Sequence, residues 1–408
     1  MDFTPTEEQQ AARELAARVF ADLATHERLR AAGTGTDVEL WQALCAAGLP
    51  GAVEEVGLLG LVLLLEEQGR RTAQVPFAAS CAYGILAVSR HGTEEQRARL
   101  LPGLRAGTTV MTGAFPGTGT GTITPGGGAG GGRLSGVADG VPWLRDADHV
   151  LVPDRDRTLW LVRTEDAAAV EAVELTAPWA AARLVLDGTP AERLGTGGPG
   201  AHGDVLIAAR TAFAGLQAGV CAGSLARAVE HTSVREQFGR PLSTHQAVQL
   251  RAAEAHMDTE AIRVTAYEAA WRFDAGLDAA GAALTAAWWA SEAGKRVVHT
   301  GQHLHGGAGA DLDHPVHRHF LWGRQLDAYL GCGTELLAEL GDLLAEPSAA
   351  ELPLGVPARS AGSAGSARSS AAPLTAPLTA PLTAPLTAPL TAPLTAPLTV
   401  PPTRGEPA

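Results

Sequence analysis

Apolar residues recur at helical spacing through the first hundred residues of the chain. The run from Leu15 to Leu23 follows two possible capping boxes, Thr4-x-x-Glu7 and Thr6-x-x-Gln9, which are typical of a helix N-terminus. Four more segments continue the pattern: Trp41 to Leu49, Leu58 to Glu67, Phe77 to Ser89 and Thr93 to Leu104. We therefore expect residues 1–106 to form an N-terminal α-helical domain.

The pattern changes over residues 107–202, where glycine and proline are frequent. Short apolar runs, such as Asp148–Pro153 and Thr158–Val162, alternate there with turn residues, which predicts a small middle β domain. The glycine-rich stretch Gly117–Gly132 could suggest a phosphate-binding loop. It lacks a final Lys-Ser/Thr pair and no helical pattern follows it, so a loop between strands is the favoured interpretation.

Helical periodicity returns in the last part of the core. Four segments carry it: Val205 to Ser233, Thr244 to Asp274, Ala279 to His303 and Asp327 to Ala345. Long Ala-rich helices of this kind pack as an antiparallel bundle, so residues 203–346 are predicted to form a C-terminal four-helix bundle. The expected fold class is α+β, with helices, then strands, then helices.

Residues 347–408 form a low-complexity tail. The unit Ala-Pro-Leu-Thr repeats seven times between Ala372 and Thr399. Proline at every fourth position removes backbone donors that a helix or sheet needs, so we expect a disordered, extended segment. A dispensable extension is favoured over a spacer or docking tether.

Composition narrows the class of protein further. The formal net charge is −13, which disfavours a nucleic acid or an anionic membrane as partner. Four widely separated cysteines argue against a disulfide framework. The acidic N-terminus has no signal-peptide pattern, and the longest apolar run, Val56–Leu65, is about half a membrane span. We therefore expect a cytoplasmic protein without a membrane partner.

Three segments in the second helical part carry distinctive motifs. Arg235–Leu242 reads Arg-Glu-Gln-Phe-Gly-Arg-Pro-Leu, His303–Gly309 contains a His-Gly-Gly turn after a long helix, and Leu330–Glu335 opens the last helix. Together with the order of the domains, these segments resemble the acyl-CoA dehydrogenase family of flavoproteins. The N-terminal segments Leu65–Arg70 and Gly92–Gln96 are similar to that family's first domain.

The resemblance implies an FAD cofactor and an acyl-CoA substrate. An FAD pyrophosphate needs a fixed cation and backbone donors, and glycine allows the backbone to approach the nucleotide closely. We expect the His-Gly-Gly turn and the Arg235 segment to reach one FAD from different subunits, with Phe238 against its ring system. The structural alternatives are that Arg235 is a solvated cation at a helix end and that Gly306 and Gly307 only end a helix. The cofactor-binding candidates are Arg235, Gln237, Phe238, His245, Gln246, His303, Gly306, Gly307 and Thr334.

The chain departs from the family pattern near the flavin. His303 stands where members usually carry a glutamine, and Met111–Phe115 replaces the Thr-Glu-Pro segment that lines the flavin and the thioester. Trp143 could lie near the flavin, although an ordinary core tryptophan is the favoured interpretation.

The largest departure concerns the catalytic base. The family reaction removes the α-proton of an acyl thioester, usually with a glutamate that precedes a Gly-Thr pair. Here Cys332 precedes Gly333-Thr334, and a shifted alignment gives Leu330. A thiol of ordinary pKa, about 8.5, is a poor base. The remaining acids, Glu335, Asp204 and Glu230, are unconvincing substitutes, so no catalytic residue is assigned.

The segment Gly306–Trp322 looks like the bacterial acyl-CoA dehydrogenases of steroid side-chain degradation, which assemble as mixed α2β2 tetramers. This implies a paralogous partner subunit or a homotetramer, and electron-transfer flavoprotein as electron acceptor. His314, His317 and His319 also invite a metal-site interpretation. Their spacing fits no defined ligand pattern, so we expect a hydrogen-bonded loop and no metal.

Two functions follow from the sequence. The favoured one is FAD-dependent α,β-dehydrogenation of an acyl-CoA within an oligomer. The alternative is a non-catalytic structural subunit that lacks its own base and completes the site of a partner.

Overall fold

The structure is a computed structural model of the whole chain and describes residues 2–115, 123–126, 132–196 and 200–345. The predicted tail, residues 347–408, lies outside the described residues, as does most of the glycine-rich stretch Gly117–Gly132. Residues 1–350 make up one compact unit, and every contact below lies within it.

The N-terminal region is helical, as predicted. Thr6 caps the first helix. Its hydroxyl oxygen accepts from the backbone N–H of Gln9, and the side-chain oxygen of Gln9 accepts from the backbone N–H of Thr6. This capping box therefore forms, and the one expected at Thr4 does not. A π-helical turn, η1 (Ser80–Leu86), interrupts the expected helical segment Phe77–Ser89. The α-helices are α1 (Glu7–Leu23), α2 (His26–Ala31), α3 (Val38–Ala46), α4 (Leu49–Arg71), α5 (Phe77–Ala79), α6 (Ala87–His91) and α7 (Glu94–Ala106).

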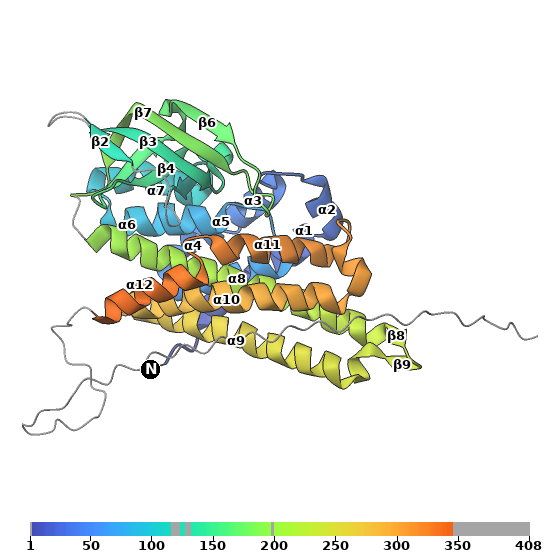
Figure 1. Cartoon of the computed structure of the whole chain (residues 1–408). Coiled ribbons are helices and arrows are strands. Elements are labelled where there is room, and N and C mark those ends of the chain that lie inside the picture. Colours follow the sequence, from blue (N-terminus) through green and yellow to red (C-terminus); the bar gives the residue numbers. More distant parts are fainter. Residues whose placement is uncertain (1, 116–122, 127–131, 197–199, 346–408) are drawn as a thin grey trace, which may run out of the picture. The chain divides into compact units, whose positions relative to one another are not determined.

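The middle region forms a sheet that lies above the helices in Figure 1. Among the described residues its strand order is β1-β4-β5-β7-β3-β2, with β6 paired to β7, and β1 is parallel to β4. The two apolar runs that predicted strands are β4 and β5. The strands are β1 (Met111–Gly113), β2 (Thr124–Gly126), β3 (Gly132–Val141), β4 (His149–Pro153), β5 (Leu159–Arg163), β6 (Ala169–Ala172) and β7 (Ala182–Arg193).

The C-terminal region is helical, as predicted, but two expectations there are wrong. A further helix, α11 (Pro315–Ala328), holds His317 and His319 where a loop was expected, and the last helix begins at Gly333 and not at Asp327. Leu330 and Gly331 have φ angles of 64° and 113°, which end one helix before the next begins. A short hairpin joins the first two long helices. The elements are α8 (Gly200–Val234), β8 (Glu236–Gln237), β9 (Arg240–Pro241), α9 (Gln246–Asp274), α10 (Ala280–Leu304), α11 (Pro315–Ala328) and α12 (Gly333–Ala345).

Helix α8 is the most apolar long helix of the described chain. By length and composition it could cross a membrane, and the bent pair α3 and α4 passes the same test together. Of the most apolar window of α8, 83% is buried inside the protein. Packing against α4, α9 and α10 therefore accounts for its apolar character.

Backbone contact between α4 and α8 joins the two helical regions. Gly215, Gly219 and Gly223, four residues apart, lie on one face of α8. A Cβ atom at Gly219 would lie 2.1 Å from the carbonyl oxygen of Glu66, and one at Gly223 would lie 2.4 Å from that of Arg70. Only glycine permits this distance between the helices.

Replacing the central glycine tests this contact. We expect Gly219→Ala to lower the free energy of unfolding by about 1–3 kcal/mol, because the new methyl group has no room. Gly203→Ala is the matched control on the same helix. No atom lies within 4 Å of the position of its Cβ, so it should be neutral or slightly stabilising. Chemical denaturation measures both, and equal effects would contradict the close contact.

Candidate functional site

The Arg235 motif forms a strained hairpin at one end of the bundle. Helix α8 ends at Val234, and the strands β8 and β9 are joined by Phe238 and Gly239 alone. Both residues have positive φ angles, 54° and 78°, as a type I′ turn requires. For a bulky residue such as phenylalanine this backbone conformation is unfavourable, yet the Phe238 side chain is 89% exposed. The hairpin therefore presents an aromatic ring to the outside at a cost in stability.

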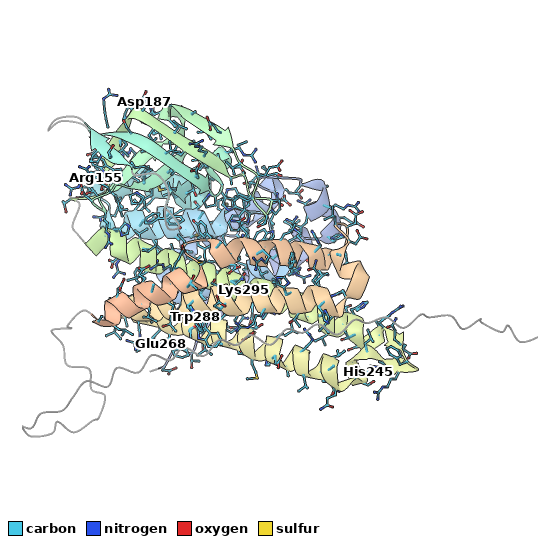
Figure 2. The ribbon with its side chains drawn as sticks, in the orientation of Figure 1. Arg155, Asp187, His245, Glu268, Trp288 and Lys295 are labelled. Carbon is cyan, nitrogen blue, oxygen red and sulfur yellow. The ribbon has the colours of Figure 1, made fainter. Side chains whose placement is uncertain are left out.

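The helix α9 supports this hairpin. The His245 ring lies edge-on to Phe238, with 5.9 Å between ring centroids, and Arg240 lies 3.3 Å from His245 Nδ1. Gln246, the first residue of α9, is exposed beside it. Figure 2 shows His245 at the end of the bundle, remote from Trp288 and Glu268. The side chain of Arg235 is exposed and forms no hydrogen bond or ion pair with a described residue.

The His-Gly-Gly motif forms the turn that follows α10. Gly306 has a φ angle of 62°, and Gln302 holds the turn by donating to the carbonyl oxygen of Gly309 at 3.1 Å. A Cβ at Gly306 or Gly307 would meet nothing within 4 Å. Both glycines therefore face open space, where a ligand can approach the backbone.

Helix direction brings the two motifs together. Because α8, α9 and α10 follow one another up and down the bundle, α8 ends, α9 begins and α10 ends on the same side (Figure 1). The rings of His231 and His305, one from each motif's helix, stack with centroids 4.7 Å apart. We expected these motifs to reach one FAD from different subunits. The structure instead places both at the same end of one chain.

Thr334 lies apart from the other predicted cofactor residues, and His303, in the last turn of α10, faces a groove. His303 is exposed on α10 and lines an open groove of about 780 Å³ between α9 and α10. Thr334 lies in the first turn of α12, where Gly333 packs against Glu292 in the middle of α10. Glu292 is twelve residues from the end of α10, roughly 18 Å along the helix axis. Thr334 therefore does not belong to the same group as the hairpin and the glycine turn.

Aromatic side chains fill the interior where the sheet meets the helices. The chain contains 8 Trp, 3 Tyr and 8 Phe residues, and seven of these lie in one cluster. Within it, the Tyr83 ring stacks on Phe115 at 5.1 Å, and the Phe213 and Tyr329 rings meet at 4.5 Å. The hydroxyls of Tyr83 and Tyr329 hydrogen-bond at 2.8 Å. The cluster consists of Tyr83, Phe115, Trp143, Trp179, Phe213, Trp322 and Tyr329.

The segment Met111–Phe115 contributes directly to this cluster. A Cβ at Gly113 would lie 2.5 Å from the Tyr83 ring, and Phe115 is buried. Trp143 is 2% exposed and stacks on Trp179, so it is the core tryptophan that we favoured from the sequence. The positions that would line a flavin and a thioester in the family instead pack against protein.

None of the carboxylates considered from the sequence faces this interior. Asp204 lies 3.3 Å from both Arg90 and His91. The Glu335 carboxylate accepts from the backbone N–H of Cys332 at 2.9 Å, as an acid in the first turn of a helix does. Glu230 is exposed on α8. None of these three acids therefore lies where it could act as a base in a buried reaction centre.

Sequence reasoning missed an ion pair beside the cluster. Arg210 on α8 makes two hydrogen bonds, of 2.8 and 2.6 Å, to the carboxylate of Glu339 on α12. These bonds, with the charge of Arg210, lower the pKa of Glu339, which makes it a weak base. Nearby, burial and the charges of Arg157 and Arg210 lower the pKa of His202 to about 4. Arg210 and Glu339 are 129 residues apart in the sequence, so no local motif predicts their ion pair.

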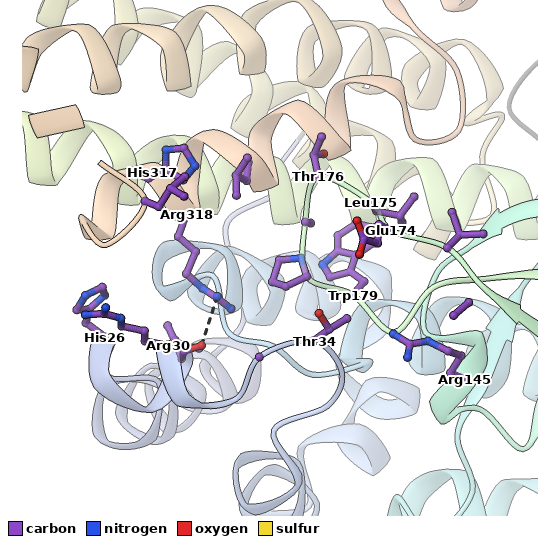
Figure 3. A pocket seen from close by; sticks show the side chains of 18 of the residues that line it. His26, Arg30, Thr34, Arg145, Glu174, Leu175, Thr176, Trp179, His317 and Arg318 are labelled. Atoms are coloured by element: carbon purple, nitrogen blue, oxygen red, sulfur yellow. Dashed lines mark hydrogen bonds between the residues drawn. The ribbon is translucent and has the colours of Figure 1, made fainter. Parts of the chain in front are cut away.

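A cavity of about 610 Å³ lies beside the aromatic cluster (Figure 3). It opens between α2, the segment 172–179 and α11. Of the described residues that line it, one is a carboxylate, Glu174, which is exposed. The remaining polar lining is mostly cationic or imidazole: His26, Arg30, Arg145, His314, His317 and Arg318.

Arg318 supports the wall of this cavity. Its guanidinium donates to the carbonyl oxygen of Thr72 at 3.3 Å and to Gln74 Oε1 at 2.6 Å, both neutral acceptors. Burial lowers the pKa of Arg318 to about 10. These bonds tie α11 to the segment that follows α4.

The histidines of the segment that invited a metal-site interpretation have separate contacts. His314 caps α11 by accepting from Val316 N at 3.2 Å, and His319 lies buried with Nε2 3.0 Å from the carbonyl oxygen of Arg70. Over the described ranges no three His, Cys, Asp or Glu side chains are arranged to hold a metal ion.

Comparison with known proteins identifies the family. The family model for the acyl-CoA dehydrogenase N-terminal domain matches residues 6–108, and the model for the C-terminal domain matches residues 199–338. Acyl-CoA dehydrogenase FadE27 of Mycobacterium tuberculosis (strain ATCC 25618 / H37Rv) is 34% identical over 380 residues, which cover 86% of this chain and all of FadE27.

Two solved structures have the same fold over the matched core. A variant of the Tcur3481-Tcur3483 steroid ACAD is 42% identical, with a TM-score of 0.79 over 83% of this chain and 98% of that one. The ChsE4-ChsE5 complex from Mycobacterium tuberculosis is 33% identical, with a TM-score of 0.80 over 86% of this chain and all of the matched chain. The chain belongs to the acyl-CoA dehydrogenase family, the flavoproteins that use FAD to oxidise acyl-CoA thioesters, as its motifs predict.

Proposed function

We propose that this chain is the non-catalytic subunit of a heteromeric acyl-CoA dehydrogenase, and that its exposed end completes the FAD site of a partner subunit. One observation carries the proposal. The FAD-type motifs lie open at one end of the chain, while aromatic side chains fill the interior between the sheet and the helices. The chain therefore has the means to hold part of the cofactor, but none of the three acids considered from the sequence as its base, Asp204, Glu230 and Glu335, faces the interior.

The residues at the open end fit the charged half of FAD. Arg235 offers a guanidinium that no described residue occupies, and guanidinium binds phosphate oxygens in a planar, two-bonded geometry. Gly306 and Gly307 leave their backbone accessible. Phe238, held in a strained turn, offers a flat ring for stacking. These residues would bind and orient the cofactor, which accepts the substrate's β-hydrogen as hydride when bound.

The chemistry itself is assigned to the partner. Removing the α-proton of a thioester requires a base positioned against that carbon. Glu339 is held by Arg210, Asp204 is paired, and Glu335 accepts from the Cys332 backbone. A partner that keeps the family's glutamate and an open interior would supply the base and the pocket.

The relatives suggest the substrate class and the partner. Because one similar structure is described as a steroid ACAD and another as a complex of two subunits, we propose a steroid acyl-CoA as substrate and a paralogous acyl-CoA dehydrogenase as partner. Electron-transfer flavoprotein is the proposed electron acceptor. The acceptor would meet the flavin in the assembled complex and not this chain alone.

Substitutions at the open end test the cofactor role. In the complex with the proposed paralogous partner, Arg235→Gln should weaken FAD binding about 10- to 100-fold, because a charge-assisted contact to phosphate is lost. Phe238→Ala should also weaken it. Titration of the apo complex with FAD, followed by flavin fluorescence, measures the affinity. Arg155→Gln, on the exposed rim of the sheet, is the control, and an equal loss in that variant would refute a specific role.

Cys332 provides the test of the missing base. The thiol lies 3.4 Å from Thr334 Oγ1 at the exposed start of α12. Cys332→Ala in the assembled complex should therefore leave the turnover of acyl-CoA unchanged, whereas loss of a positioned base costs about 10²–10⁴ in rate. A collapse of kcat with the flavin retained would identify the thiol as the base and contradict the proposal.

A further inference from the structure

A stripe of basic residues leads along α8 to the open end. Arg227 and His231 are four residues apart and so lie on one face of α8. Arg235 follows the last residue of the helix and donates its backbone N–H to the carbonyl oxygen of His231 at 2.9 Å. Arg227 is partly buried, and its guanidinium forms no hydrogen bond or ion pair with any residue that the structure describes. A cation in that state has donors available for a ligand.

Imidazole rings from two other elements stack on this stripe. The His305 ring lies 4.7 Å from that of His231 and 4.8 Å from that of His314, between ring centroids. His305 is 6% exposed and donates its Nδ1–H to the carbonyl oxygen of Gly301 at 2.7 Å. We call His305 and His314, which lie against His231 of the stripe, the imidazole stack.

One further arginine, two acids and one further imidazole surround the imidazole stack and Arg227. His26 from α2 faces His314, and Arg71 from α4 faces Arg227. The acids are Asp311, which faces His314, and Glu230, which faces Arg227. Burial, followed by the neighbouring imidazoles and Arg227, lowers the pKa of His305, and burial and Arg227 also lower that of His314. Without a ligand, both rings are therefore neutral near pH 7.

We infer that the imidazole stack and Arg227 are a second recognition element for the FAD diphosphate, and that the stack takes up protons when the diphosphate binds. This inference rests on the proposed role of the open end. The diphosphate carries two negative charges, which would offset the repulsion that keeps the rings neutral. Arg235 then anchors the cofactor at every pH, whereas the stack adds affinity only when it is protonated.

The direction of the pH dependence follows from linkage. A bound anion raises the pKa of a nearby imidazole, so in the window between the free and bound pKa values binding takes up protons. Affinity must then increase as pH falls through that window. Each coupled proton changes the dissociation constant by up to about tenfold per pH unit. Binding that depended on Arg235 and backbone donors alone would show no such slope.

The test titrates the apo complex of the full chain and its partner with FAD between pH 6 and pH 8. Calorimetry in two buffers of different ionisation enthalpy counts the protons taken up at each pH. We expect tighter binding at pH 6 than at pH 8, by about tenfold or more, and a buffer-dependent heat. His314→Asn should flatten this slope, while Arg227→Gln should weaken binding at every pH.

His256→Asn, an exposed histidine on α9, is the matched control and should keep the slope of the unmodified complex. Asparagine can also cap α11, so His314→Asn preserves that structural role. Loss of the slope with an unchanged melting temperature would support the inference. Affinity that is independent of pH, with no buffer-dependent heat, would overturn it and leave the proposed function intact. A complex that binds no FAD would overturn both.

Discussion

Backbone contact between α4 and α8 is the constraint on which the other features depend. The glycines of α8 bring its carbonyl and amide groups against those of α4, and no larger side chain fits at Gly219. This fixes the path of a helix that is 35 residues long. Near its middle, α8 places Phe213 in the aromatic cluster, and at its end it carries His231 and Arg235 to the open surface. One rigid helix therefore connects the closed interior to the exposed end.

The physical contrast between these two regions explains the division of roles. In the interior, the described aromatic rings pack on one another, and the hydroxyls of Tyr83 and Tyr329 form a hydrogen bond. At the open end, Phe238 keeps an unfavourable backbone conformation without the benefit of burial, and Arg235 has no described partner. The strained backbone of Phe238 and the side-chain donors of Arg235, unpaired among the described residues, lie at the surface, where a bound molecule can contact both.

Local patterns predicted much of this molecule, and long-range packing supplied the rest. The helix–strand–helix order and the capping box at Thr6 follow from short-range signals. The position of both cofactor motifs at one end of the same chain depends on the direction of the long helices and was not expected. The break at Leu330 was missed because the helical pattern runs on across it. The aromatic cluster, the Arg210–Glu339 pair and the contact of the imidazole stack with His231 join segments that are distant in sequence, so no motif could reveal them. The glycine spacing of α8 is visible in the sequence, but its meaning depends on which helix lies opposite.

The central claim is that this chain completes a flavin site without containing one. The most direct measurement is the flavin stoichiometry of the purified complex, obtained from its visible absorbance after denaturation and the amount of each subunit. The account predicts one FAD for each pair of one such chain and one partner, and essentially none for this chain purified alone. Two FAD molecules per pair, or stoichiometric flavin on the isolated chain, would contradict it.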